Sequence, residues 1–132
     1  MKIEPYLCGA ISGLIIKEAQ EWRLQASSLW PDALDPMRRK LGDPWLIDEL
    51  VVYDKLDIEK CTFVLLRWRK IWPISAGACM EVLHAYNHGK LILVWIDEGW
   101  ELPPWIDYHV NHKFNTLELL HEHSRRYFGL PA

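Results

Sequence analysis

The sequence lacks any long apolar run. Within its 132 residues, no stretch approaches the roughly 20 consecutive apolar side chains that a membrane-spanning helix needs. The opening residues MKIEPYLCGA also lack the basic and then apolar pattern of a secretory signal. We therefore expect a cytoplasmic protein with no membrane span.

Cysteines and basic blocks are also scarce, and each shortage excludes a class of protein. The three cysteines, Cys8, Cys61 and Cys79, form no Cys-x-x-Cys pair, so we expect buried free thiols rather than a disulfide framework or a zinc site. The longest basic block is RRK at 38–40, and 15 basic against 18 acidic side chains give a net charge of −3. Duplex nucleic acid is not an expected partner, because binding its phosphates requires a basic face.

Apolar and aromatic side chains are abundant. Hydrophobic residues make up 50% of the chain, and eight residues are tryptophan. A domain of this length buries roughly two-thirds of the surface of its unfolded chain, which suffices for one core. We therefore predict a single domain over 1–132. Tryptophan is favoured at subunit interfaces and in pockets for flat ligands.

Hydrophobic periodicity divides the chain into alternating strands and helices. Short apolar runs predict strands at 3–8, 33–35, 61–67 and 91–96, and steps of three and four residues predict helices at 14–30, 43–60, 76–86 and 116–128. The helix at 43–60 is expected to bury Leu46, Leu50, Val51 and Ile58. Prolines and glycine predict a loop at 35–45, and the segment 97–114 is expected to be irregular.

This alternation predicts an α/β fold, a single doubly wound domain of flavodoxin-like or Rossmann-like type with a central parallel sheet. Ligands of such sheets bind beyond the carboxyl ends of the strands. The candidate site is therefore formed by residues 6–13, 35–39 and 67–81.

Glu81 is the most informative side chain in this set. It follows a turn that contains Ser75 and Gly77, about one turn inside the predicted helix. The start of a helix presents free amide groups, which favour a phosphate or a sugar hydroxyl. Apolar neighbours, Met80 and Val82, predict partial burial of Glu81. The pattern alone also allows a solvated helix residue or a partner of the helix dipole.

Several segments form an ordered set: YLCGAISG at 6–13, EWR at 21–23, LDPMR at 34–38 and SAGAxxExxxAxxxGK at 75–90. Together they resemble the nucleoside 2-deoxyribosyltransferase family, including the related 2′-deoxynucleoside 5′-monophosphate N-glycosidases. The resemblance runs in order from Tyr6 to about Ile96, with a looser match in the last helix.

The resemblance implies chemistry at an N-glycosidic bond with Glu81 as nucleophile. A carboxylate below the sugar attacks the anomeric carbon as the base departs, and a second base or water resolves the glycosyl ester. Tyr6 matches the tyrosine that orients the nucleophile. Asp54 aligns with an aspartate at the base end of the site, where the departing base needs a proton, and Asp57 is a second possible match. Pattern alone leaves a core tyrosine and surface helix charges as alternatives.

The resemblance also implies a set of substrate-binding residues, each of which has an ordinary structural alternative as a turn, a surface charge or a core residue. They are Gly9, Ser12 and Gly13 in the first loop, Asp35, Met37 and Arg38 in a loop near the base or phosphate, Ser75 and Gly77 at a helix start, and Trp72, which could stack on a base.

Ser75 departs from the transferases, which carry an aspartate there to hold the sugar 5′-hydroxyl. A serine, as in the monophosphate hydrolases, suits an anionic 5′-phosphate because two negative groups would repel each other. We therefore predict cleavage or transfer of the N-glycosidic bond of a 2′-deoxynucleoside or its 5′-monophosphate. The alternatives are a strict 5′-monophosphate N-glycosidase and a non-catalytic nucleotide-binding or interaction module.

Relatives in this family assemble so that a C-terminal segment of one subunit closes the site of its neighbour. The resemblance thus implies a homodimer or larger homo-oligomer with shared sites, and the segment 105–114, with Asn111 as a substrate-binding residue, is the candidate. His84 and His88 have the four-residue spacing that a metal site can use. No motif fixes an acidic third ligand, so we expect no metal and no cofactor.

Overall fold

The computed structural model describes residues 1–11, 13–40 and 47–131. Within these ranges, a parallel sheet has the order β1-β2-β3-β4, formed by Pro5–Cys8, Phe63–Trp68, Ile92–Ile96 and His112–Phe114. Leu34 adds an isolated parallel bridge to Tyr6, on the edge of β1 that β2 leaves open. The direction in which the chain adds strands reverses at β1, which places the topological switch point of the sheet between β1 and β2.

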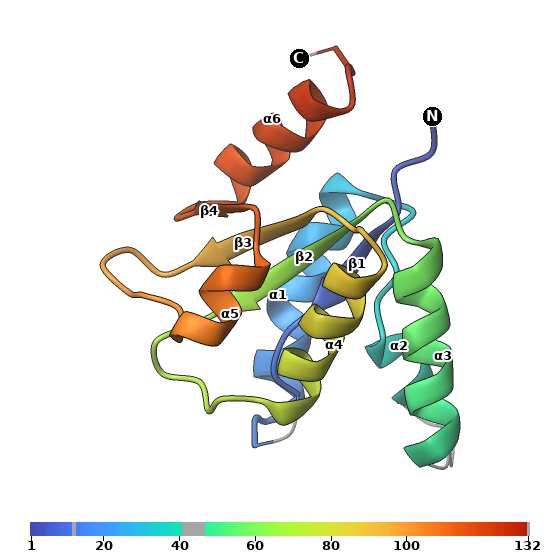
Figure 1. Ribbon diagram of the computed structural model, residues 1–132, viewed down its shortest axis with the longest axis vertical. Coiled ribbons are helices and arrows are strands. Elements are labelled where there is room, and N and C mark those ends of the chain that lie inside the picture. The colour runs from blue at the N-terminus through green and yellow to red at the C-terminus, as the bar shows by residue number, and fades with distance from the viewer. Residues whose placement is uncertain (12, 41–46, 132) are drawn as a thin grey trace.

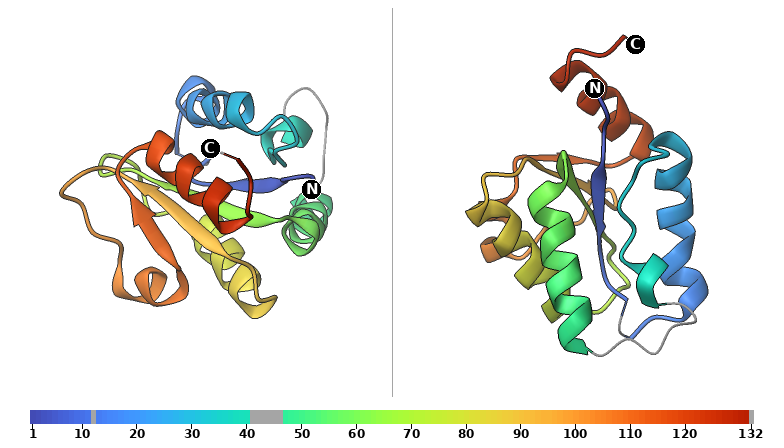
Figure 2. Two further views of the ribbon diagram at one scale, coloured as in Figure 1. Left: turned by 90° about the horizontal axis from the view of Figure 1, so that it is seen from above. Right: turned by 90° about the vertical axis from the view of Figure 1, so that its right-hand side faces the viewer.

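Helices cover both faces of this sheet (Figures 1 and 2). α1 (Ile16–Leu29) and α6 (Leu117–Tyr127) lie on one face, and α3 (Ile47–Lys60), α4 (Ala76–Asn87) and α5 (Pro104–His109) lie on the other. A single turn, α2 (Met37–Lys40), lies next to α1 (Figure 2). The predicted doubly wound α/β fold with a central parallel sheet is confirmed. Among the described residues, no helix has both the length and the apolar character to cross a membrane.

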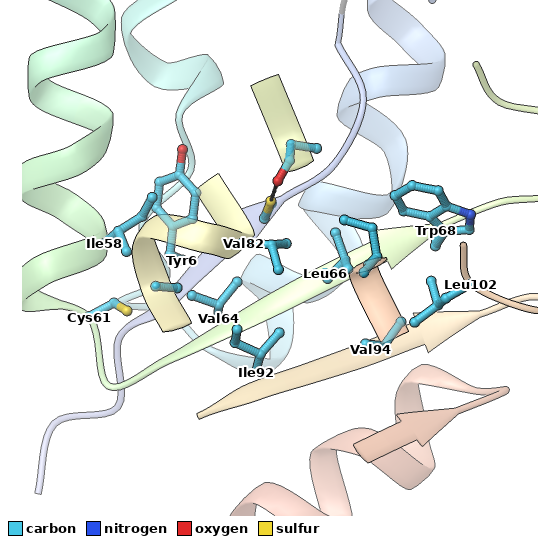
Figure 3. Packing of buried hydrophobic residues seen from close by; sticks show 14 of the residues in the cluster. Tyr6, Ile58, Cys61, Val64, Leu66, Trp68, Val82, Ile92, Val94 and Leu102 are labelled. Atoms are coloured by element: carbon cyan, nitrogen blue, oxygen red, sulfur yellow. Dashed lines mark hydrogen bonds between the residues drawn. The ribbon is translucent and has the colours of Figure 1, made fainter. Parts of the chain in front are cut away.

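The strand β2 shows how the two halves of the core are formed. Successive side chains of a strand point to opposite faces of the sheet. Val64 and Leu66 pack with Val82 of α4 (Figure 3), whereas Phe63 and Leu65 pack on the face of α1 and α6. All six residues of β2 are buried, which explains the apolar run FVLL at 63–66; the fifth residue, Arg67, is a buried charge.

The buried face of α3 differs from the predicted one. Val51 is 46% exposed, and Leu46 lies outside the described residues, whereas Ile58 is buried as expected. Asp54 and Asp57 occupy buried positions of α3 instead. The pattern is misleading here because a carboxylate can be buried when cationic side chains pair with it, and those side chains come from another part of the chain.

Two segments predicted to lack regular structure contain short elements. The loop expected at 35–45 includes α2, and the irregular stretch expected at 97–114 includes α5 and β4. Prolines indicated a break there, but Pro104 stands in the first turn of α5, where its missing amide proton would have no helical partner. β4 is too short to show periodicity, and His112 and Lys113 within it are exposed.

Candidate active site

The centre of the candidate site is a hydrogen bond between Tyr6 and Glu81. Tyr6 lies within β1, and its side chain stands on the face covered by α3 and α4, near Ile58 and Val82 (Figure 3). Glu81 lies in the second turn of α4 and is partly buried. The Tyr6 hydroxyl donates to Oε2 of Glu81. The fold thus brings together two residues that are 75 positions apart in the sequence.

Cys8 contacts the other oxygen of the same carboxylate. Its Sγ lies 3.5 Å from Oε1 of Glu81 and 3.7 Å from the carbonyl oxygen of Ala78. Burial and the charge of Glu81 raise the pKa of the Cys8 thiol well above its usual value. Burial and the charges of Glu81 and Asp54 likewise raise the pKa of Tyr6 far above its usual value. Both groups therefore stay protonated at neutral pH and act as neutral donors.

A buried arginine fixes the loop that follows β1. Arg23 of α1 is fully buried; its Nη2 donates to the carbonyl of Gly9 at 3.1 Å and its Nη1 to the carbonyl of Ala19 at 2.6 Å. Its Nε lies 3.6 Å from Oδ1 of Asp35. Burial lowers the pKa of Arg23, and the negative charges of Asp35 and Glu81 oppose this shift. Arg23 therefore places a positive charge in the field of the carboxylate Glu81.

The predicted loop residues at 35–38 belong to the same network of contacts around Arg23 and α3. Oδ1 of Asp35 accepts from the amide of Met37 at 2.9 Å, and Sδ of Met37 lies 3.7 Å from Nη1 of Arg23. Arg38 donates to the carbonyl of Asp35 at 2.8 Å and to Oδ2 of Asp57 at 2.7 Å. Asp35, Met37 and Arg38 thus lie beside the site, with these polar groups engaged by the protein itself.

Asp54 and Asp57 face different surroundings on α3. Asp57 accepts hydrogen bonds from Arg39 at 2.6 and 3.1 Å, in addition to the one from Arg38. Burial alone would raise the pKa of Asp57, but the hydrogen bonds from Arg39 and Arg38 outweigh it and lower the pKa. Asp54 lies 3.7 Å from Arg39, and its charge acts on the Tyr6 hydroxyl.

Ser75 and Gly77 shape the start of α4. Ser75 is the N-cap, and its Oγ accepts from the amide of Ala78 at 3.1 Å. A Cβ added to Gly77 would come no nearer than 3.8 Å to Oγ of Ser75, so the fold itself does not require glycine there. Ser75 and Trp72 line a small pocket at the carboxyl ends of β1 and β2, together with Ala10, Arg67, Trp68, Arg69, Pro73 and Ala78.

The glycines of the first loop have roles within the fold. A Cβ on Gly9 would lie 2.9 Å from Cζ2 of Trp22 and 3.3 Å from the carbonyl oxygen of Arg67, so close packing excludes a side chain. Gly13 has a φ of 86°, a conformation that favours glycine. The third predicted residue of this loop, Ser12, lies outside the described residues.

Asn111 is not brought to this cluster within its own chain. Its Oδ1 accepts from the amide of Ile92 at 2.7 Å, and its own amide donates to the carbonyl of Ile92 at 2.9 Å. Ile92 begins β3, so Asn111 lies at the amino edge of the sheet, whereas the pocket lies at the carboxyl edge. Asn111 thus anchors the beginning of β4 against β3.

Three residues that contact the site were not predicted from the sequence to have a role in it. Arg23 stands in the EWR segment and Arg39 in the RRK block, but a charged residue in a sequence does not reveal its own burial. Cys8 was expected only to be a buried free thiol, as it is. The position of Cys8 beside the site could have been predicted, because residues two apart on a strand lie on the same face, and Cys8 is two residues from Tyr6.

The same fold occurs in solved structures of other proteins. A 2-deoxyribosyltransferase from Bacillus psychrosaccharolyticus matches with a TM-score of 0.74 and 14% identity, over 89% of this chain and 90% of that one. The CMP N-glycosidase BcmB of Clostridium botulinum matches with a TM-score of 0.64 and 16% identity, over 94% and 98%. A 2-desoxiribosyltransferase from Leishmania mexicana matches with a TM-score of 0.69 and 11% identity, over 95% and 98%.

No family model and no curated protein matches the sequence. The structural matches show that the chain has the 2-deoxyribosyltransferase fold, in agreement with the resemblance found in its motifs.

Proposed function

We propose that this protein cleaves or transfers the N-glycosidic bond of a 2′-deoxynucleoside or its 5′-monophosphate, with Glu81 as the nucleophile. The observation that carries the proposal is the carboxylate of Glu81 held at both oxygens by neutral donors, Tyr6 and Cys8. A nucleophile must be oriented without losing its charge, and neutral donors meet both conditions.

The reaction proceeds in two displacements. An oxygen of Glu81 forms a bond to the anomeric carbon while the bond from that carbon to the base nitrogen breaks, and its electron pair leaves with the base. Water or the nitrogen of an acceptor base then attacks the same carbon and releases Glu81 as carboxylate. Two inversions leave the configuration retained. An acceptor base gives transfer, and water gives hydrolysis.

The departing base needs a proton, and Asp54 is the residue we propose for this step. Asp57 is unsuited, because Arg38 and Arg39 lower its pKa and hold it as an anion. Asp54 is buried, and its charge acts on the same tyrosine hydroxyl that contacts Glu81. It therefore lies near the groups that take part in the proposed reaction.

A 5′-monophosphate is the donor that Ser75 favours. The first amides of α4 have no carbonyl partners within the helix, and the helix dipole favours an anion at this end. The Ser75 hydroxyl already accepts from Ala78 and keeps its own proton for donation. The absence of a side chain at Gly77 leaves the approach to these amides open.

Chromatography of free base tests the proposed function. Purified protein is incubated with each 2′-deoxynucleoside and each 5′-monophosphate, with and without an acceptor base. We expect base release or exchange that is lost in Glu81→Ala. If wild type and Glu81→Ala bind nucleotides equally and neither releases base, the enzymatic function is excluded. The alternative of a non-catalytic nucleotide-binding module then takes its place.

Ser75→Asp tests the phosphate preference in the same assay. Aspartate also caps helices well, so α4 keeps its N-cap. Its negative charge repels a phosphate, and we expect the ratio of monophosphate to nucleoside turnover to fall. An unchanged ratio would contradict a phosphate subsite at Ser75 and leave the nucleophilic role of Glu81 intact.

We also propose a homo-oligomer, as the resemblance implies. Trp105 and Tyr108 of α5 are 83% and 72% exposed, and large aromatic side chains of this kind are enriched at interfaces. Sedimentation velocity at micromolar concentration tests this expectation. Sedimentation as a monomer at every concentration would contradict it.

A further inference from the structure

Three side chains of metal-ligating type meet where α3 and α4 end. Glu59 lies in the last turn of α3, His84 lies in the last turn of α4, and His88 is the C-cap residue of α4. The two helices lie side by side (Figures 1 and 2). One ligand atom from each of the three side chains lies within 4.8 Å of the other two. This cluster is separate from the pocket at the start of α4.

The distances in the cluster are close to those of a metal site. Nε2 of His84 lies 2.9 Å from Oε2 of Glu59, and the two imidazole ring centroids are 4.2 Å apart. Ligand atoms bound to one tetrahedral zinc ion are about 3.3 Å apart, given bonds of about 2.0 to 2.2 Å. Small rotations of exposed or half-buried side chains therefore suffice to reach a common ion.

A backbone hydrogen bond orients the imidazole of His88 so that it can act as a ligand. Its Nδ1 lies 2.8 Å from the carbonyl oxygen of His84. A carbonyl only accepts, so Nδ1 carries the proton and the lone pair of Nε2 is left for a metal. Metal-bound histidines almost always donate their second nitrogen in this way. The carbonyl end of the α4 dipole also favours a positive charge at this place.

Nearby lysines make their contacts elsewhere. Lys60, which follows Glu59, has its Nζ 3.5 Å from Oε2 of Glu4. Lys90, close after His88, donates to the carbonyl of Cys61 at 3.1 Å. In these contacts neither Lys60 nor Lys90 is paired with the carboxylate of Glu59.

We propose that Glu59, His84 and His88 bind a divalent transition metal ion of the Zn²⁺ type, with water completing the coordination. Imidazole nitrogens and carboxylate oxygens together suit this ion. From the sequence we expected no metal, because no motif fixed an acidic ligand; the fold supplies that ligand from a second helix. The bound ion cross-links α3, which carries Asp54, to α4, which carries Glu81.

Isothermal titration of chelator-treated protein with Zn²⁺ tests the site directly. We expect one ion per chain. His88→Ala should weaken binding by at least about tenfold, since the loss of even an outer partner typically costs about ten- to a hundredfold. His112→Ala is the matched control, because it removes one exposed histidine from a different surface and should bind as wild type does. Equal affinities of wild type and His88→Ala would overturn the proposal.

A second variant and a second readout guard against a folding artefact. Glu59→Gln keeps the size of the side chain and a hydrogen bond to His84, but removes the charge that attracts the ion. We expect it to weaken Zn²⁺ binding while its circular dichroism stays that of wild type. At the same Zn²⁺ concentration, Zn²⁺ should also raise the Tm of wild type more than that of His88→Ala. A Tm that does not respond in wild type would contradict the cross-link.

Discussion

Glu81 of α4 and Asp57 of α3 are carboxylates on neighbouring helices that the protein holds in opposite ways. Glu81 accepts from two neutral donors, the hydroxyl of Tyr6 and the thiol of Cys8. Asp57 accepts from the guanidinium groups of Arg38 and Arg39. Neutral donors fix a carboxylate in place and leave its charge available, whereas guanidinium groups neutralise it. The first arrangement suits a nucleophile, and the second fastens α2 to α3.

The largest expected effect is the loss of activity in Glu81→Gln. Glutamine has the same size and can still accept from Tyr6, but an amide oxygen is a poor nucleophile. We expect base release to fall by at least about 10⁴-fold, as when other enzymes lose their nucleophile. Urea unfolding should change little, because glutamine keeps the size of the side chain and can still accept from Tyr6. Glu122→Gln, on the exposed face of α6, should release base as wild type does. Activity in Glu81→Gln above a tenth of wild type would refute this role.

A smaller loss is expected for Tyr6→Phe, which removes only the hydroxyl. The carboxylate of Glu81 remains but loses one of the donors that orient it, and misplacement of a reacting group by about 1 Å can cost about 10²-fold in rate. We expect kcat to fall by about this factor with a modest change in KM. Tyr127→Phe, on the exposed side of α6, is the control and should leave both constants unchanged. A Tyr6→Phe enzyme with normal kcat would mean that Tyr6 is a core residue only.

For Asp57→Asn the effect should appear in stability instead. The variant loses charge-assisted hydrogen bonds from Arg38 and Arg39, each worth about 1.5 to 3 kcal/mol, and we expect at least one such loss in the free energy of unfolding. Asp107→Asn breaks an exposed pair with Lys113 and should cost no more than about 0.5 kcal/mol. Urea denaturation measures both. Equal costs would show that burial does not distinguish the two pairs.

The smallest effect concerns the pH dependence of stability at Asp97. Burial alone would raise the pKa of Asp97, but hydrogen bonds from the Lys70 amide and Arg67 lower it. A lowered pKa in the folded state stabilises the fold above the ordinary aspartate pKa of about 3.9, and this gain is lost as pH falls through the lowered value. The deficit of Asp97→Asn should therefore be present at about pH 6 and shrink toward about pH 3. A deficit that is constant with pH would contradict the shift.

The elements with clear periodicity were predictable from the sequence, and the polar network was not. The apolar run before Arg67 and the helix after Ser75 have almost the bounds expected. The burial of Arg23 and Asp57 could not be predicted, because each depends on a partner far away in the chain. The short strand β4 could not be predicted for a related reason: its strand geometry comes from pairing with β3 and not from its own side chains.

Part of the candidate site was likewise predictable from the sequence, and part required the structure. The family resemblance implied that Tyr6 and Glu81 lie in one site, and the fold joins the two side chains by a hydrogen bond. The proposed preference for Asp54 over Asp57 required three dimensions, because the sequence does not show that Arg38 and Arg39 both donate to Asp57.

The most direct test of the central claim is intact-mass spectrometry of the protein quenched during turnover. With a 2′-deoxynucleoside 5′-monophosphate as donor, we predict a mass increase equal to one deoxyribosyl 5-phosphate group, located on Glu81 by peptide analysis and lost in Glu81→Gln. Base release by the wild type with no such adduct at any quench time, or an adduct that persists in Glu81→Gln, would contradict a covalent intermediate on Glu81.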